Sequence, residues 1–298
     1  MTEVTKEKEY GLNRGNLKMI ALFCMTIDHF SIAIVESLIR ILPKGGIYHS
    51  LCVITDFCIR GVGRLAFPIF CFFIVEGFLH TRSVTRYALR LFLLALISEV
   101  PFDMVISHKY YSTTYQNVFW TLLIGLIAIY VIDSAFKKYN TKIAYVIGSL
   151  AGIAACLCGG CFRTDYASVG VMTIIAIYLV EQDKIKFAVV LNFIAQLIKL
   201  FSTKQTVGLL VLNLISIVLF SYVIIMSKRI LDINVQKAYV ACATLSSLNL
   251  YEMFTLVNVV LLGRYNGQKG KGGKWLFYLY YPLHLAIAAG VCMLVGLY

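Results

Sequence analysis

The chain of 298 residues is 60% hydrophobic and only 14% charged, and its mean hydropathy is +0.81. Soluble domains carry about 25% charged residues, so this composition excludes a soluble globular protein. The apolar residues form long continuous runs, which excludes a transmembrane barrel with its short segments of alternating polarity. The net charge of +12 comes from basic residues that stand singly or in small groups between apolar runs. This pattern favours contact with lipid headgroups over nucleic-acid binding.

The predicted elements are all helices. Residues 1–16 carry acidic and basic side chains and precede a long apolar run without a small-residue cleavage site. We therefore expect a short soluble segment there and not a removable signal peptide. Residues 17–298 are expected to form a single integral membrane domain, because apolar runs follow one another throughout. These runs predict helices near residues 17–39, 65–81, 86–107, 117–136, 142–160, 166–181, 185–201, 206–227, 238–263 and 275–297. The fold expected is an all-α, polytopic transmembrane helix bundle of about ten spans in the cytoplasmic (plasma) membrane.

The nine cysteines are an odd number, and most of them lie within apolar runs. They are therefore expected to pack as small hydrophobic side chains and not to form a disulfide framework. Cys156, Cys158 and Cys161 lie close together, but no histidine accompanies them. We expect no metal there.

The first apolar run places a cation, Lys18, and an imidazole, His29, on nearly the same face of one helix. Eleven residues make almost three turns, so the two side chains stand about 16 Å apart along the axis. Asp28 and His29 lie well inside the run, where a charge costs roughly 2.5–3.5 kcal/mol on insertion scales. An acid and an imidazole at this depth indicate a functional pocket. His29 is the best candidate base, because imidazole titrates near neutrality.

Asp28 points about 100° around the helix from His29, so it cannot orient the ring across its own turn. We expect an orienting carboxylate from another helix, and the candidates are Glu76, Asp103 and Glu252. Each of these acids has an alternative role as half of an intramembrane ion pair.

Arg82, Arg86 and Arg90 recur every four residues, which places them on one stripe at the start of a helix. Two interpretations stay open: a positive anchor that fixes topology, and a clamp in which guanidinium groups and the helix N-terminus bind phosphates. Together with Lys18 and a buried His29, the clamp predicts a ligand with phosphates at the rim and a reactive end about 15 Å deeper. Coenzyme A has this shape.

Further polar residues are candidates for a substrate site or secondary roles: Arg60, Arg64, Glu99, Asp103, Glu252, Asn266 and His284. Arg60 and Arg64 are expected to meet Glu76 or Asp56, or to cap an interface.

Some of these residues are expected to lie beside irregular backbone, in two parts of the chain. Pro101 should break or kink its span and so present Glu99 and Asp103. The stretch 265–274 is expected to form a flexible basic loop with an Asn-Gly turn, and the last span then delivers His284.

Long motifs in colinear order over residues 17–290 resemble the TraX family, whose founding member acetylates the N-terminus of a conjugative pilin. The motifs are Lys18-x10-His29, GRLAFPIFCFFIVEGFLHTR, TRYALRL, SEVPFD, QNVFWTLLIGL, DYASVGV, RYNGQKG and FYLYYPLHL. That family is in turn similar to the acyltransferase type 3 superfamily of ten-helix membrane acyltransferases. Those enzymes have an Arg-x10-His motif on the first helix and an FF-x-x-SGF stretch on the second.

The resemblance implies roles for particular residues. Lys18 and His29 match the Arg-x10-His motif, with a lysine that keeps the charge and loses the bidentate fork. Glu76 stands where the superfamily has serine, which is typical of TraX. The residues and the resemblance together lead us to expect His29, Asp28 and Glu76 as catalytic residues, and Lys18, Arg82, Arg86 and Arg90 as cofactor-binding residues.

The implied reaction is transfer of an acetyl or acyl group from acetyl-CoA, without a metal, to an amine or hydroxyl acceptor. The acceptor would be a pilin-like N-terminus or a cell-envelope glycan. Two other functions stay open. A proton-coupled transporter or exporter of a lipid- or glycan-linked substrate would use Asp28, Glu76 and Glu252 as a proton relay. A non-catalytic membrane assembly partner would use its buried charges only to pair helices.

Overall fold

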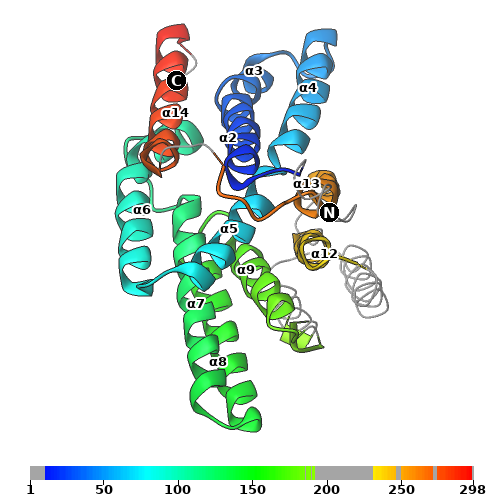
Figure 1. Ribbon diagram of the computed structural model, residues 1–298. Helices are drawn as coiled ribbons and strands as arrows, with labels where there is room; N and C mark the ends of the chain where they lie inside the picture. The colour runs from blue at the N-terminus through cyan, green and yellow to red at the C-terminus, as the bar shows by residue number, and fades with distance from the viewer. Residues whose placement is uncertain are drawn as a thin grey trace.

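The computed structural model describes residues 11–184, 186–188, 190–191, 231–245, 250–270 and 274–296. Over these residues the chain is helical apart from short connections and two isolated bridges (Figure 1). This confirms the all-α prediction. The predicted span 206–227, most of 185–201 and residues 1–10 lie outside the described residues. The single domain over 17–298 stays a prediction.

The described helices between Arg14 and Glu181 have short connections. In chain order they are α2 (Arg14–Phe30), η1 (Ser31–Val35), α3 (Glu36–Ile41), α4 (Ile47–Gly63), α5 (Ala66–His80), α6 (Val84–Ser107), α7 (Val118–Lys138), α8 (Thr141–Cys161), α9 (Ala167–Glu181), α12 (Ile233–Leu245), η2 (Leu250–Leu256), α13 (Val257–Gly263) and α14 (Lys274–Val295). Asn13, Ser83, Asn117 and Asn140 begin α2, α6, α7 and α8, and each side chain accepts a hydrogen bond from a backbone N–H of the first turn.

Five stretches of the described chain are long and apolar enough to cross a membrane. They are Arg14–Ile41, Ile47–His80, Val118–Lys138, Thr141–Cys161 and Tyr278–Val295. These helices identify a membrane protein, but the prediction of ten spans is not confirmed. Helix α9 and the stretch Glu252–Gly263 are apolar but shorter.

Three local expectations differ from the structure. The sequence does not predict α4, because polar residues interrupt its apolar pattern; α4 leads into α5 with only Arg64 and Leu65 between them. The described parts of the predicted span 238–263 are α12, the 3-10 helix η2 and α13. Pro101 lies inside α6, which continues to Ser107, so the helix does not break there; a kink stays a prediction.

Helix α2 organises the region of the candidate site. It packs against α4, α5 and α14, while α7, α8 and α9 pack together beside them (Figure 1). The buried residues Leu17, Ala21 and Met25 recur every four positions, which is the period of one helix face, and buried His29 continues this face. Directly beyond His29 and Phe30, the π-helical turn Ser31–Val35 leads into α3. Such turns are frequent at functional sites.

The predicted flexible loop is tied to the start of α2. The backbone N–H of Leu12 donates to Arg264 O at 2.7 Å, and that of Asn266 donates to Leu12 O at 3.0 Å. The Asn266 side chain donates to Gly11 O at 3.2 Å. Residues 265–270 therefore pair with residues 11–14, and Asn266 has a structural role at this junction.

Candidate active site

Two cavities lie along the buried face of α2. The larger one, about 500 Å³ and called the polar cavity here, is lined by the charged side chains of Asp28, Glu36, Arg40, Arg60, Arg64, Asp165 and Glu252, together with His29 and several aromatic rings. The smaller one, about 150 Å³ and called the narrow cavity, has mostly apolar walls and Lys18 as its charged lining residue.

The two cavities meet at four side chains, because Met25, Phe70, Val118 and Tyr281 line both. Lys18 lines the narrow cavity and His29 the polar cavity. The unbroken helix α2 carries both residues, so they stand about 16 Å apart along its axis. The structure thus turns the predicted cation and imidazole toward two adjoining spaces, and the His29 ring faces a cavity and not lipid.

A second histidine orients His29. His29 Nδ1 lies 2.7 Å from His284 Nε2, and His284 Nδ1 lies 2.9 Å from the carbonyl oxygen of Tyr280. A carbonyl oxygen only accepts, so neutral His284 carries its proton on Nδ1 and its Nε2 accepts a hydrogen bond from His29 Nδ1–H. The lone pair of His29 is then on Nε2, the nitrogen that a general base uses. The orienting group is an imidazole and not the predicted carboxylate.

A second polar contact fastens α14 to α2 close to this pair. Thr26 Oγ1 donates to Leu22 O at 2.7 Å and lies 2.8 Å from the Tyr280 hydroxyl, which therefore donates to Thr26. The rings of Tyr280 and His284 stack with their centroids 5.4 Å apart. The position of His284 beside His29 is thus fixed by two contacts, one helical turn apart on α14.

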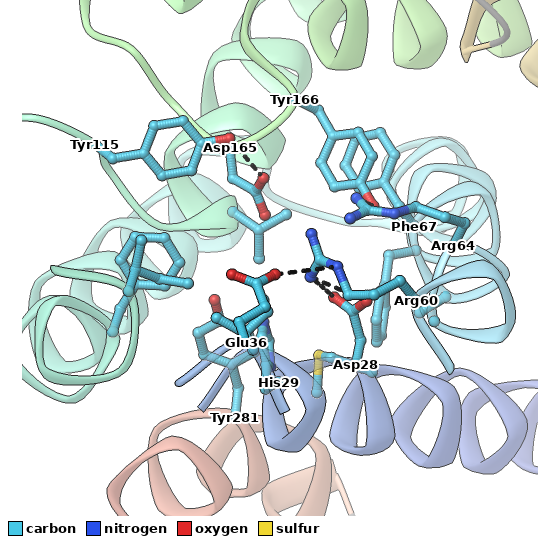
Figure 2. A pocket seen from close by; sticks show the side chains of 18 of the residues that line it. Asp28, His29, Glu36, Arg60, Arg64, Phe67, Tyr115, Asp165, Tyr166 and Tyr281 are labelled. Carbon is cyan, nitrogen blue, oxygen red and sulfur yellow. Dashed lines mark hydrogen bonds and ion pairs between the residues drawn. The ribbon is translucent and has the colours of Figure 1, made fainter. Parts of the chain in front are cut away.

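Asp28 forms an ion pair across the polar cavity (Figure 2). Arg60 Nη1 on α4 donates to both carboxylate oxygens of Asp28 at 3.2 Å, and Arg60 Nε lies 3.6 Å from Glu36 Oε1. Gly63 permits this approach of α4, because a Cβ at that position would lie 2.4 Å from the Asp28 side chain. Arg60 therefore joins the two acids of the first span, and it does not meet Glu76 or Asp56 as predicted.

Arg64 forms the second charged cluster of the polar cavity. Its Nε lies 3.7 Å from Glu252 Oε1, and its Nη1 donates to the Tyr166 hydroxyl at 3.0 Å. The Tyr166 ring stacks on Phe67 at 3.7 Å between centroids. Glu252 is 1% exposed, so the ion pair with Arg64 compensates a buried carboxylate.

Asp165 faces the same space from the connection between α8 and α9 (Figure 2). Tyr115, in the connection before α7, donates its hydroxyl hydrogen to Asp165 Oδ1 at 3.1 Å. Burial raises the pKa of the Asp165 carboxyl, and the positive charge of Arg64 opposes this rise. The negative charge of Asp165 in turn raises the pKa of Tyr115, so this phenol stays a hydrogen-bond donor.

Glu76 does not reach His29. Its carboxylate lies 3.4 Å from Arg14 Nη2 and 3.8 Å from His80 Nδ1, and it lines neither cavity. The prediction that Glu76 orients His29 is therefore wrong. Helix α5 turns this residue toward Arg14 at the start of α2, about four helical turns from His29.

The arginine stripe lies at the start of α6, where Arg82 and Arg86 are exposed. The Arg90 guanidinium stacks over the Tyr87 ring, 5.7 Å from its centroid, and Tyr87 lines the narrow cavity. Lys18 Nζ lies 5.4 Å from the centroid of another wall residue, Phe73. The stripe is thus near the narrow cavity through Tyr87, but the arginines themselves line neither cavity.

The two acids of α6, Glu99 and Asp103, accept hydrogen bonds from the connection to α7 and from the start of α7. Glu99 accepts a hydrogen bond from Trp120 Nε1 at 2.9 Å and another from the Asn117 side chain. Asp103 is fully buried and accepts the backbone N–H of Ser112 at 2.7 Å. Neither acid lines a cavity. The described residues contain no group of three or more His, Cys, Asp or Glu side chains placed to hold a metal ion.

Several residues of the site were not selected from the sequence: Glu36, Arg40, Tyr115, Asp165, Tyr166 and Tyr281. Asp165 and Tyr166 belong to the DYASVGV motif, and Tyr281 to FYLYYPLHL. Polar residues at the ends of apolar runs were the available signal for these three.

The chain is similar to known proteins over most of its length. It is 27% identical over 290 residues to the probable fimbrial assembly protein FimC, serogroup H1, of Dichelobacter nodosus, a match that covers 93% of this chain and 94% of that protein. No solved structure matches the chain. The family described as TraX protein matches residues 13–234, which include α2 with Lys18 and His29, and the chain therefore belongs to the TraX family.

Proposed function

We propose that this protein is an acyltransferase of the plasma membrane that transfers an acetyl or acyl group from acetyl-CoA to an amine or hydroxyl acceptor. One observation carries the proposal: His29, with its lone pair on Nε2, lines the polar cavity, and this cavity shares four lining residues with the narrow cavity that Lys18 lines. Membership of the TraX family supports it as well. The relation to the acyltransferase type 3 superfamily belongs to the same proposal.

The narrow cavity suits the donor. Its walls are mostly apolar, and Lys18 stands about three helical turns from His29. The long thin arm of coenzyme A would lie in this cavity, with its phosphates toward Lys18 and its thioester toward His29. Exposed Arg82 and Arg86 add positive charge near that end.

The polar cavity suits the acceptor, and His29 suits the proton transfer. The acceptor nitrogen or oxygen forms a bond to the acyl carbon while His29 Nε2 takes its proton, and the carbonyl electron pair moves onto the oxygen. When the carbonyl re-forms, the carbon–sulfur bond breaks and the leaving thiolate takes the proton from His29. Asp28, held by Arg60, lines the same cavity and fixes the charged wall near His29.

The name of the relative, a probable fimbrial assembly protein, favours a second candidate, a non-catalytic role in assembling surface filaments. In that case the ion pairs of Arg60 with Asp28 and of Arg64 with Glu252 would only hold α4 and η2 against the rest of the bundle. A pilin-like protein fits both candidates, as the acyl acceptor in the first and as the assembly partner in the second. The proton relay through Asp28, Glu76 and Glu252 has less support, because Glu76 pairs with Arg14 away from the polar cavity.

The test is transfer of radiolabel by the purified full chain in detergent, with labelled acetyl-CoA as donor and native membrane extract as acceptor source. We expect label in an acylated product, together with release of coenzyme A as its free thiol. The variant His29→Ala should lower the rate by about 10²- to 10⁴-fold, because it removes the base.

The matched control is His49→Ala, since His49 lines neither cavity. Equal membrane expression and equal melting temperatures would show that both variants fold. Full transfer by His29→Ala would refute the role of His29. Failure of the wild-type protein to transfer label would refute the acyltransferase proposal and favour the assembly role.

A further inference from the structure

The side chain of Tyr281 is the polar group at the meeting point of the two cavities. Of the four side chains that line both, the other three are Met25, Phe70 and Val118, which are apolar. Tyr281 is 3% exposed. Its phenol is therefore part of the wall between the space proposed for the donor and the space proposed for the acceptor.

Aromatic packing fixes the Tyr281 ring beside the base. The ring makes edge-to-face contacts with His29 at 5.8 Å, with His284 at 5.4 Å and with Phe119 at 4.9 Å between centroids. Figure 2 shows the ring next to His29, with its hydroxyl directed toward the interior of the polar cavity. A ring held on three sides presents its hydroxyl in one position.

The hydroxyl hydrogen has no acceptor within hydrogen-bond distance in the described part of the chain. The backbone N–H of Val118, in the first turn of α7, approaches the hydroxyl oxygen. That N–H can only donate, so it leaves the hydroxyl hydrogen available. Buried hydroxyl groups normally donate their hydrogen to an acceptor, and one whose hydrogen has none calls for an explanation.

We propose that the Tyr281 hydroxyl donates a hydrogen bond to the carbonyl oxygen of the reacting thioester and stabilises the negative charge that develops there. The inference rests on the proposed acyl transfer. In the addition step the carbonyl electron pair moves onto this oxygen while His29 takes the acceptor proton. Tyr281 keeps its own proton throughout, and its hydrogen bond strengthens as the oxygen becomes negative.

The arginines of the polar cavity are less suited to this role. Arg60 contacts Asp28 and Glu36, and Arg64 contacts Glu252 and the Tyr166 hydroxyl. Each would have to leave a carboxylate to reach the acyl oxygen. The Tyr281 hydroxyl donates to no carboxylate among the described residues, so it can donate to the substrate without breaking another contact.

The test compares Tyr281→Phe with Tyr265→Phe in the transfer assay described above. Tyr265 is a matched control because it is also buried, its hydroxyl also has no hydrogen-bond partner among the described residues, and it lines neither cavity. We expect Tyr281→Phe to lower the maximal rate at saturating acetyl-CoA on the order of 100-fold, with the KM for acetyl-CoA within about twofold of wild type. Tyr265→Phe should keep the wild-type rate.

A wild-type rate in Tyr281→Phe, or a raised KM with an unchanged maximal rate, overturns the assignment while the proposed function stands. Absence of transfer by the wild-type protein overturns the proposed function itself. Should Tyr281→Phe be lost from the membrane, ring-fluorinated tyrosine at position 281 keeps the ring and makes the hydroxyl a stronger donor. A maximal rate that does not respond to fluorination then overturns the assignment.

Discussion

The polar and narrow cavities adjoin the same face of α2, yet their linings differ in the number of charged side chains. In the polar cavity the guanidinium groups of Arg60 and Arg64 each contact a carboxylate, and Gly63 allows α4 to come close enough for one of these pairs. In the narrow cavity Lys18 is a charged group in a mostly apolar lining. The comparison teaches that ion pairs between helices set the shape of the polar cavity, whereas the narrow cavity joins mostly apolar walls to the positive charge of Lys18, which suits the arm and the phosphates of the proposed donor. Changes in the polar cavity should therefore alter turnover or stability, and changes in the narrow cavity should alter donor affinity.

The largest of the expected effects concerns His284. The variant His284→Ala removes the group that accepts His29 Nδ1–H, so the ring of His29 can turn and change tautomer. We expect the maximal rate to fall about 10- to 100-fold, less than for His29→Ala because the imidazole remains. The KM for acetyl-CoA should stay close to the wild-type value.

His284→Gln separates positioning from packing, because an amide oxygen also accepts a hydrogen bond. It should recover part of the lost rate and of the wild-type pH profile. If the glutamine and alanine variants were equally impaired in rate and pH profile, His284 would act only through packing.

The next effect concerns the close contact in the polar cavity. Gly63→Ala would place a Cβ 2.4 Å from the Asp28 side chain and separate α4 from α2. We expect a loss of about 1–3 kcal/mol in stability, as for other overpacked sites. The measurement is the melting temperature in a fixed detergent.

Gly160→Ala is the matched control, since a Cβ there meets no atom within 4 Å. It should leave the melting temperature unchanged or raise it, because alanine is favoured over glycine in a helix. Equal melting temperatures for the Gly63 variant and wild type would show that the pair of Asp28 and Arg60 does not depend on this close approach.

Local periodicity was sufficient to predict the part of the site that one helix carries. Lys18, Asp28 and His29 all belong to α2, and the period of an α-helix fixes their relative directions without knowledge of the rest of the fold. The Asn13 cap and the apolar stripe of α2 are likewise local features. The predictions for Lys18, Asp28 and His29 needed only neighbouring residues.

The contacts between distant helices were not predictable in this way. His29 and His284 are 255 positions apart, and helix packing that no local pattern specifies brings them together. Glu76 was expected beside His29 because of its place in a motif, but α5 turns it toward Arg14. Helix α4 was missed because polar residues interrupt its apolar pattern, and one of them, Arg60, lines the polar cavity.

A smaller effect is expected in the narrow cavity. Lys18→Ala should raise the KM for acetyl-CoA about tenfold, because hydrogen bonds to charged groups contribute about 1.5–3 kcal/mol. The maximal rate should change little, since Lys18 lies about three turns from His29. Lys18→Arg should retain most of the affinity, because it keeps the charge.

Lys142→Ala serves as the control, because Lys142 is exposed and lines neither cavity. A lower maximal rate with an unchanged KM in Lys18→Ala would contradict the division of roles between the two cavities.

The smallest effect is expected from the arginine stripe. The double variant Arg82→Glu, Arg86→Glu reverses two exposed charges that line neither cavity. It should therefore affect acetyl-CoA only through its long-range electrostatic field. Salt screens exposed charges over about 10 Å at 0.1 M, so we expect a two- to threefold rise in the KM for acetyl-CoA at low salt that fades as salt is added. The same reversal at Lys137 and Lys138, at the end of α7, controls for net charge. If the two double variants had the same KM at low salt, the stripe would be a topology signal alone, and donor recognition would rest on Lys18 and the narrow cavity.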